Sequence, residues 1–188
     1  MKEKLRNYLR INTKLNDEQI DSIASYFKPK TIKKNTFLLS EGEICKELYF
    51  VHSGCIRTYY LTTQGHEKTR YVAFEGSIAT SIASFISQQP SLELVDALED
   101  SVVYVISHKD FHGLIAELPA WAEFYRMLLE MAYLYQNKKI ENLVTLSAKQ
   151  RFDKLMAETP IYIQRLSNRI LASFLDITQE TLSRLKSK

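Results

Sequence analysis

The sequence predicts an α+β fold: a double-stranded β-helix or jelly-roll barrel flanked by helices, then a long helix and a carboxy-terminal helix-turn-helix. Between residues 30 and 106 the hydrophobic period is two, and runs of β-branched and aromatic residues alternate with glycine-containing turns. The segment 120–146 has helical periodicity and contains neither glycine nor proline. We therefore expect a barrel domain over residues 1–118, a long helix over 119–146 and a helix-turn-helix domain over 147–188.

Length and composition are those of an ordinary soluble globular protein. Of the 188 residues, 45% are hydrophobic and 25% are charged. No run of about 18 uncharged apolar residues predicts a membrane span, and no apolar stretch follows Met1 as in a secretory signal. Cys45 and Cys55 are too few to cross-link a secreted fold of this size, and their strand-like surroundings predict buried thiols. We expect a cytoplasmic protein with no membrane partner.

The charges are unevenly distributed along the chain. Residues 147–188 hold eight Lys or Arg and four Asp or Glu, a net charge of +4. The other residues hold 17 basic and 18 acidic groups, a net charge of −1. A basic tail on a nearly neutral body favours contact with phosphates, although a solvated protein face has the same composition.

Local signals predict the elements of the barrel domain. A helix carrying Ile20, Ile23 and Phe27 on one stripe is expected to end before Pro29. Strands are predicted at residues 31–34, 37–39, 48–51, 55–61, 69–74 and 102–106. The segment 77–98 is less strand-like and leaves room for a helix near residues 80–86. Ser107, followed by an acidic residue three positions later, predicts the start of a short helix.

The long helix carries a heptad-like apolar seam. Its members recur at spacings of three and four: Trp121, Phe124, Leu128, Met131 and Tyr135. A second apolar face beside this seam favours a helix that packs both on its own domain and on a partner copy. The next helix is predicted over 147–158 and ends before Pro160, followed by a short connecting stretch over 161–164.

The last 22 residues hold the most specific motif. Two helices, 167–175 and 178–187, are predicted with hydroxyl caps at Ser167 and Thr178. Asp176 stands at the turn, where such motifs usually carry glycine because the backbone adopts a positive φ. This spacing matches a helix-turn-helix, and the alternative is an ordinary helical hairpin with a polar outer face.

A small residue and six apolar residues complete that motif. Ala172 lets the two helices cross closely. The shared core is expected from Ile170, Leu171, Leu175, Ile177, Leu182 and Leu185.

The outer face of the second helix has the chemistry for reading base pairs. Arginine binds guanine through two hydrogen bonds, glutamine suits adenine, and a carboxylate accepts from cytosine. The expected base-reading residues are Gln179, Glu180, Ser183 and Arg184. Phosphate contacts are expected from Arg165, Ser167, Asn168 and Lys186. The partner that fits these groups is double-stranded DNA.

The order of these motifs resembles the Crp/Fnr regulators, which join a cyclic-nucleotide-binding-type sensor barrel to a carboxy-terminal helix-turn-helix. The resemblance covers roughly residues 15–187. It rests on the segments 41–43, 49–57, 74–76, 97–107 and 178–184. It implies a homodimer formed through the long helix, with two recognition helices reading a two-fold symmetric DNA site. It also implies RNA polymerase as a further partner.

The chain departs from this family in the phosphate-binding part of the barrel. Members that bind cyclic AMP hold the ribose with a glutamate and the phosphate with an arginine. Ser81 stands at the glutamate position, and residues 91–93 lie near the arginine position. Arg57 and Arg70 are predicted to be solvated strand residues, so a buried cyclic phosphate would lack a counter-charge. Cyclic AMP is therefore not expected, no cofactor is assigned, and a different small effector or none fits better.

Polar residues near these positions are candidates for an effector pocket. They are Thr80, Ser81, Ser91, Gln136 and Asn137, and their alternative role is hydrogen bonding within the barrel. The sequence stops at Lys188, just past the second helix, so we expect no wing strands of the kind that many relatives carry.

Two rival functions compete with a DNA-binding regulator. His108 and His112 are four residues apart on a predicted helix, but no third ligand stands at a suitable spacing, so neither a metal site nor an enzyme is expected. The more serious rival is a dimeric sensor or protein-interaction module that has lost DNA binding. Its contact with DNA would be weak and independent of Arg184.

Overall fold

The computed structural model describes residues 2–187 and divides the chain into two compact units. The first unit contains the chain up to Tyr60 together with Arg70–Leu128, and the second contains Leu61–Thr69 together with the chain from Leu129 onward. Helix α5 (Pro119–Thr145) therefore contributes to both units. None of the helices described is long and apolar enough to span a membrane.

Two helices open the first unit, and the second is the helix predicted to end before Pro29. They are α1 (Glu3–Asn12) and α2 (Asp17–Tyr26). The α2 start is a reciprocal capping box, in which the Gln19 backbone N–H donates to the Asn16 side chain at 2.9 Å and the Gln19 side chain accepts from the Asn16 backbone at 3.1 Å. Ile20 and Ile23 point into the core.

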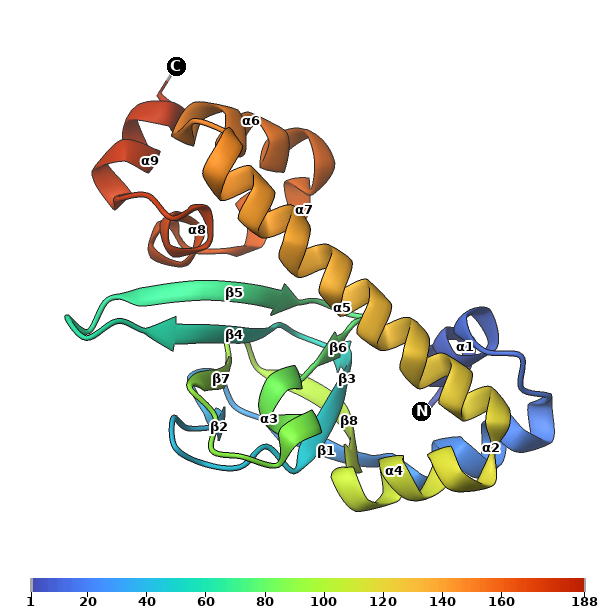
Figure 1. Cartoon of the computed structure of the whole chain (residues 1–188). Helices are drawn as coiled ribbons and strands as arrows, with labels where there is room; N and C mark the ends of the chain where they lie inside the picture. Colours follow the sequence, from blue (N-terminus) through green and yellow to red (C-terminus); the bar gives the residue numbers. More distant parts are fainter. Residues whose placement is uncertain (1, 188) are drawn as a thin grey trace. The chain divides into compact units, whose positions relative to one another are not determined.

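Eight antiparallel strands form two four-stranded sheets in the part of the chain that is described (Figure 1). One sheet has the order β1 (Lys28–Ile32), β8 (Ser101–Ser107), β3 (Glu47–Ser53) and β6 (Ile78–Ala79). The other has the order β2 (Phe37–Leu39), β7 (Glu93–Ala97), β4 (Ile56–Leu61) and β5 (Glu67–Ala73). The α+β class predicted from the sequence is confirmed.

One hydrophobic core joins the sheets of the first unit to its helices. Phe50 of β3, Phe111 of α4 (His108–Glu117) and Trp121 of α5 are fully buried in it. The Trp121 indole N–H donates to the Phe111 carbonyl at 3.1 Å, so the polar atom of this large side chain is satisfied inside the core. The start of α5 is thereby anchored in the first unit. The short helix α3 (Ile82–Ser87) confirms the helix expected near residues 80–86.

Strand β7 is the main element that the sequence did not predict. All five of its residues are buried, yet Glu93 and Asp96 interrupt the apolar pattern that identifies a buried strand. These carboxylates are tolerated because each meets an arginine of another strand, Asp96 that of the adjacent β4 and Glu93 that of β5, as described below. Strands β6 and β7 both lie in the segment that had been expected to be poor in strands.

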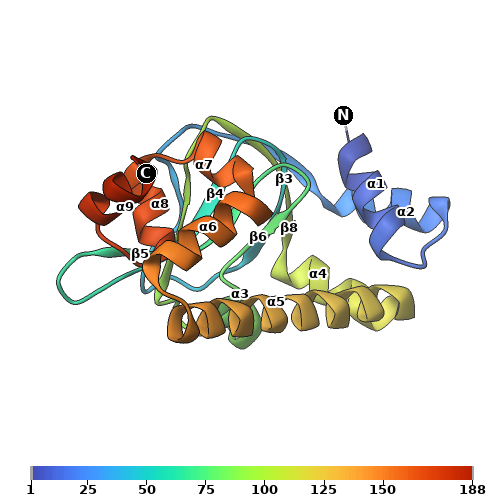
Figure 2. The same cartoon turned by 90° about the horizontal axis from the view of Figure 1, so that it is seen from above.

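The second unit gathers four short helices after α5 (Figures 1 and 2). They are α6 (Ala148–Glu158), α7 (Pro160–Arg165), α8 (Asn168–Leu175) and α9 (Gln179–Lys186). Ser147 caps α6 as predicted, with its side chain accepting from the Gln150 backbone. The connecting stretch predicted over 161–164 is wrong, because Pro160 occupies the first turn of α7, where its missing N–H costs nothing and its fixed φ suits a helix.

Candidate nucleic-acid interface

The turn between α8 and α9 has the geometry predicted for a helix-turn-helix. Asp176 adopts the left-handed conformation (φ 55°, ψ 49°), which aspartate tolerates better than most residues. The Ile177 backbone N–H donates to the Ala172 carbonyl at 3.0 Å and closes the end of α8. The turn from α8 to α9 therefore forms with Asp176, and not glycine, in the left-handed conformation.

Both helices start at the hydroxyl caps expected from the sequence. Ser167 accepts from the Ile170 backbone N–H, and Thr178 accepts from the Thr181 backbone N–H at 3.2 Å. The predicted shared core is largely confirmed, since Ile170, Leu171, Leu175 and Leu182 are buried with Ala172. Ile177 and Leu185 are half-buried.

The outer face of α9 is polar and exposed. Leu182 is fully buried on the inner face, whereas the four predicted base-reading residues are all exposed: Gln179, Glu180, Ser183 and Arg184. The Arg184 guanidinium donates two long hydrogen bonds of 3.4 Å within its own helix, to the Glu180 carbonyl and the Thr181 hydroxyl. The Glu180 backbone N–H and then the Thr178 hydroxyl lower the pKa of the Glu180 carboxyl, which keeps it ionised and able only to accept.

The predicted phosphate-binding residues come from both ends of the motif. Ser167 and Asn168 are exposed at the start of α8, and Lys186 is exposed at the end of α9. The Lys186 ammonium donates to the Asn168 amide oxygen at 2.7 Å, so these two residues lie side by side. Arg165, at the end of α7, is half-buried. Arg151, another basic residue of this unit, donates to the carbonyls of Leu146 at 2.7 Å and Leu175 at 3.0 Å.

Two buried arginine–carboxylate pairs occupy the β4, β5 and β7 part of the first unit. Arg57 lies directly opposite Asp96 across the β4–β7 ladder and donates to both carboxylate oxygens, at 2.9 and 2.6 Å. The guanidinium carbon also lies 3.8 Å from the centroid of the Tyr59 ring. Arg70, whose side chain is 10% exposed, pairs with the buried Glu93. The prediction that Arg57 and Arg70 are solvated is therefore wrong, because the acidic residues of β7 bring them into the protein as neutral pairs.

Hydroxyl groups complete the surroundings of Glu93. The Ser81 hydroxyl donates to its carboxylate at 2.6 Å and lies 2.9 Å from the Ser91 hydroxyl. Burial and the neighbouring Glu93 carboxylate raise the pKa of Tyr60 to about 12. The Glu93 carboxylate is therefore surrounded by Ser81, Tyr60 and Arg70 of its own chain.

The predicted effector-pocket residues fall into two groups. Thr80, Ser81 and Ser91 are buried in the first unit, where Thr80 lies 3.2 Å from the Cys45 thiol. Gln136 and Asn137 lie on the part of α5 that belongs to the second unit, the first half-buried and the second exposed. Cys45 and Cys55 are both free and buried, as predicted.

The comparisons with known proteins agree with this geometry. Residues 29–117 match the cyclic nucleotide-binding domain family. Over 183 residues the chain is 25% identical to the fumarate and nitrate reduction regulatory protein of Vibrio cholerae, covering 91% of this chain and 72% of that protein. In sequence and in fold this chain is similar to regulators of the Crp/Fnr family.

Solved structures of such regulators show the same fold as this chain. A protein from Eubacterium rectale, described as a transcriptional regulator of the Crp/Fnr family, superposes with a TM-score of 0.73 at 23% identity, covering 95% of this chain and 85% of that one. FixK2 from Bradyrhizobium japonicum gives a TM-score of 0.74 at 18% identity, covering 86% and 83%. The relatives named by sequence are regulatory proteins, which agrees with the expectation of a regulator and not an enzyme.

The predicted apolar seam of α5 divides into two parts. Trp121 and Phe124 are buried in the core of the first unit, and Leu128 is half-buried. Among the later seam residues, Met131 is exposed and Tyr135 is half-buried. The first half of the seam therefore packs within its own chain and is not available to a partner. Large apolar side chains are instead exposed further along: Met131, Tyr133, Leu134, Ile140, Leu143 and Val144.

Contacts between the start of β5 and α8, both in the second unit, were not predicted. The Ser173 hydroxyl accepts from the Thr69 backbone N–H at 2.8 Å and donates to the Glu67 carbonyl at 2.9 Å. Arg169 pairs with the Glu67 carboxylate at 3.1 Å, and Lys68 pairs with Asp176. These partners are more than a hundred positions apart in the sequence, and a single serine on a helix carries no local signal of such a role.

The two histidines that had suggested a metal site belong to an aromatic cluster. The rings of His108 and His112 lie 4.2 Å apart, and Phe85 and Tyr125 also contact them. Burial and then the neighbouring His108 lower the pKa of His112, which favours its neutral form. Within the described residues, no three His, Cys, Asp or Glu side chains gather as a metal site would require.

Proposed function

We propose that this regulator binds DNA sequence-specifically as a homodimer, with α9 as the recognition helix of each copy. The observation that carries the proposal is the exposed outer face of α9, which displays amide, carboxylate, hydroxyl and guanidinium groups opposite the buried Leu182. Such groups read base edges in the major groove. Arg165, Ser167, Asn168 and Lys186 would contact phosphates and set the register of the motif on the duplex.

The proposed dimer surface is the exposed apolar face of α5. Tyr133, Ile140 and Val144 are spaced by seven and four residues, so they lie on one stripe of the helix. They are 67%, 58% and 79% exposed, and a stripe this apolar favours burial against the same stripe of a second copy. Two recognition helices related by a two-fold axis would then read an inverted repeat.

The effector proposed for the barrel is a small molecule other than cyclic AMP, or none. A cyclic phosphate needs a cation to compensate its charge once it is buried. The two arginines nearest to the candidate position already pair with Asp96 and Glu93, and Ser81 donates to Glu93 as well. A phosphate would have to displace a carboxylate of the chain, so the residues present do not fit the group. RNA polymerase as a partner and the cytoplasm as the location follow from the family alone.

The rival proposal is a dimeric sensor that acts through protein contacts. It would use the same α5 surface but would not need the polar face of α9. The two proposals differ in a single measurable property, the dependence of DNA binding on Arg184.

The experiment is selection of fragments from sheared genomic DNA by the purified full chain, followed by sequencing and by titration of the enriched site at several salt concentrations. Arg184→Ala is compared with Arg10→Ala, which removes an exposed arginine of α1 in the first unit. We expect an inverted repeat to be enriched. Binding to it should weaken by about 10- to 100-fold in Arg184→Ala and remain unchanged in Arg10→Ala.

Retention without sequence preference, lost at moderate salt and equal in the three proteins, would reject the DNA-reading proposal. It would leave the sensor that acts through protein contacts. If Arg184→Ala bound DNA more weakly but with unchanged sequence specificity, Arg184 would contact a phosphate and not a base.

A further inference from the structure

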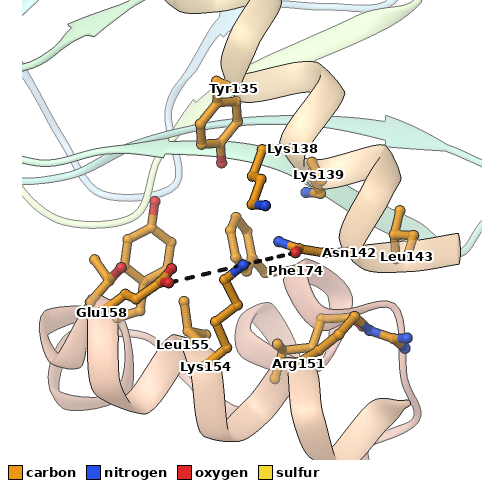
Figure 3. A pocket seen from close by; sticks show the side chains of 13 residues that line it. Tyr135, Lys138, Lys139, Asn142, Leu143, Arg151, Lys154, Leu155, Glu158 and Phe174 are labelled. Carbon is orange, nitrogen blue, oxygen red and sulfur yellow. Dashed lines mark hydrogen bonds and ion pairs between the residues drawn. The ribbon is translucent and has the colours of Figure 1, made fainter. Parts of the chain in front are cut away.

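The second unit contains a pocket between α5 and the helices α6 to α8 (Figure 3). Its volume is about 230 Å³, and its lining comes from five residues of α5, four of α6, two of α8 and the segment that connects α6 to α7 and starts α7. All of the lining residues belong to the second unit. The pocket is separate from the outer face of α9, whose residues do not line it.

The pocket carries an excess of positive charge. Its lining contains four cationic side chains, Lys138, Lys139, Arg151 and Lys154, and one carboxylate, Glu158. Arg151 is used to hold helix-end carbonyls, and Lys138 pairs with Glu141 at 3.0 Å outside the lining. The remaining excess favours an anionic ligand over a neutral or cationic one.

Lys154 is the cation that a ligand would meet most directly. Its side chain is 26% exposed, and its ammonium donates to the Asn142 amide oxygen at 3.0 Å, with Glu158 at 3.9 Å (Figure 3). The close partner of Lys154, Asn142, is thus neutral. The Glu158 carboxylate lies near the maximum distance for an ion pair, and the Glu158 side chain is 64% exposed. A ligand carboxylate would supply the charge that Asn142 lacks.

Aromatic side chains form the apolar part of the wall. The Tyr162 and Phe174 rings lie 4.8 Å apart, and Tyr135 faces the pocket from α5. The Lys139 ammonium lies 4.2 Å from the Phe174 centroid, which keeps a cation beside this ring. Flat rings and nearby ammonium groups suit a ligand that is itself flat and negatively charged.

We propose that this pocket binds a small planar aromatic anion of the aryl carboxylate class, with its carboxylate on Lys154 and its ring against Phe174 and Tyr162. The inference does not rest on DNA binding, since the pocket and its test involve the free protein only. The pocket volume suits a ligand of one or two fused rings. A ligand of this size typically binds with a dissociation constant of about 1 mM or below.

The test is calorimetric titration of the full chain with 2-naphthoate and with 2-naphthamide, which has nearly the same shape but no charge. Lys154→Gln removes the ammonium while keeping most of the stem, and Lys154→Arg restores a cation. Lys149→Gln is the matched control, because Lys149 is an exposed lysine of the same helix that pairs with Asp153 and does not line the pocket.

We expect 2-naphthoate to bind at least about fivefold more tightly than 2-naphthamide, and at least about fivefold less tightly to Lys154→Gln than to the parent protein. Lys149→Gln should bind like the parent protein, and Lys154→Arg should retain most of the affinity. Equal binding of the charged and neutral probes, equal loss in both glutamine variants, or no binding of 2-naphthoate at about 5 mM would each overturn the proposal. Far-UV circular dichroism establishes that each variant is folded, and the comparison of the two probes on the parent protein stands if Lys154→Gln is not.

Discussion

Removing the carboxylate of Asp96 should destabilise the first unit strongly. Asp96→Asn keeps the size of the side chain but removes the carboxylate to which the buried Arg57 guanidinium donates two hydrogen bonds. Arg57 is only 2% exposed, so water cannot compensate the charge, and a guanidinium does not lose its proton at neutral pH. Removing one partner of a buried pair costs about 3–5 kcal/mol, and we expect the lower end because asparagine retains one acceptor oxygen.

This loss is measurable by urea denaturation at pH 7 followed by tryptophan fluorescence. Trp121 is the single tryptophan of the chain and is fully buried in the core of the first unit, so its emission reports on that unit. The control is Asp21→Asn, which breaks the exposed pair with Arg6 and should cost less than about 1 kcal/mol. A loss of about 3 kcal/mol is a large part of the total stability of a domain.

A double variant separates the charge from the packing. Arg57→Met combined with Asp96→Leu removes both charges and keeps similar volumes, so most of the stability lost in Asp96→Asn should return. If Asp96→Asn cost no more than Asp21→Asn, the pair would not be buried as described. If the double variant were less stable than Asp96→Asn, an uncompensated charge would not be the cause of the loss.

Two further changes test the dimer surface and a strand turn. Ile140→Asp places a charge on the exposed apolar face of α5 and should shift the protein from dimer to monomer in sedimentation velocity. The control Ile11→Asp, on α1, should leave the protein dimeric. If Ile140→Asp were still a dimer, the interface would lie elsewhere. Gly54 has φ +95°, and an added Cβ would overlap Ser101, so Gly54→Ala should cost at least about 2 kcal/mol in the same urea experiment. Gly42→Ala, also in the first unit, with φ +86° and open space around it, should cost about 1 kcal/mol, and equal losses at the two glycines would contradict the predicted overlap.

The elements that the sequence predicted are those whose signals are local. Ser167, Thr178 and Asp176 each act on backbone groups within four residues, so the residue type alone indicates the cap or turn. The hydrophobic periods that predict the strands and helices of the first unit also depend only on residues that are close in the sequence. The fold class and the helix-turn-helix could therefore be read without knowing any contact between distant segments.

The features that were missed depend on partners far along the chain. Glu93 and Asp96 made β7 look unlike a buried strand, and their partners Arg70 and Arg57 lie on other strands. How the α5 seam is shared between its own domain and a partner could not be predicted for a related reason. Periodicity shows that one face of a helix is apolar, but the same period results from packing on its own domain, as at Trp121, and from packing on a second copy.

The basic tail illustrates why a count of charges does not locate a nucleic-acid interface. Arg151 holds two helix-end carbonyls, and Lys149 and Arg169 pair with carboxylates. Each of these positive charges is partly neutralised, or held in place, by the second unit itself. Arg184 differs because it is exposed and is held only by long hydrogen bonds to its own helix, with Lys186 nearby on α9. A guanidinium in that position can turn toward a base without breaking a short contact, so Arg184 and not the net charge of +4 should determine sequence specificity.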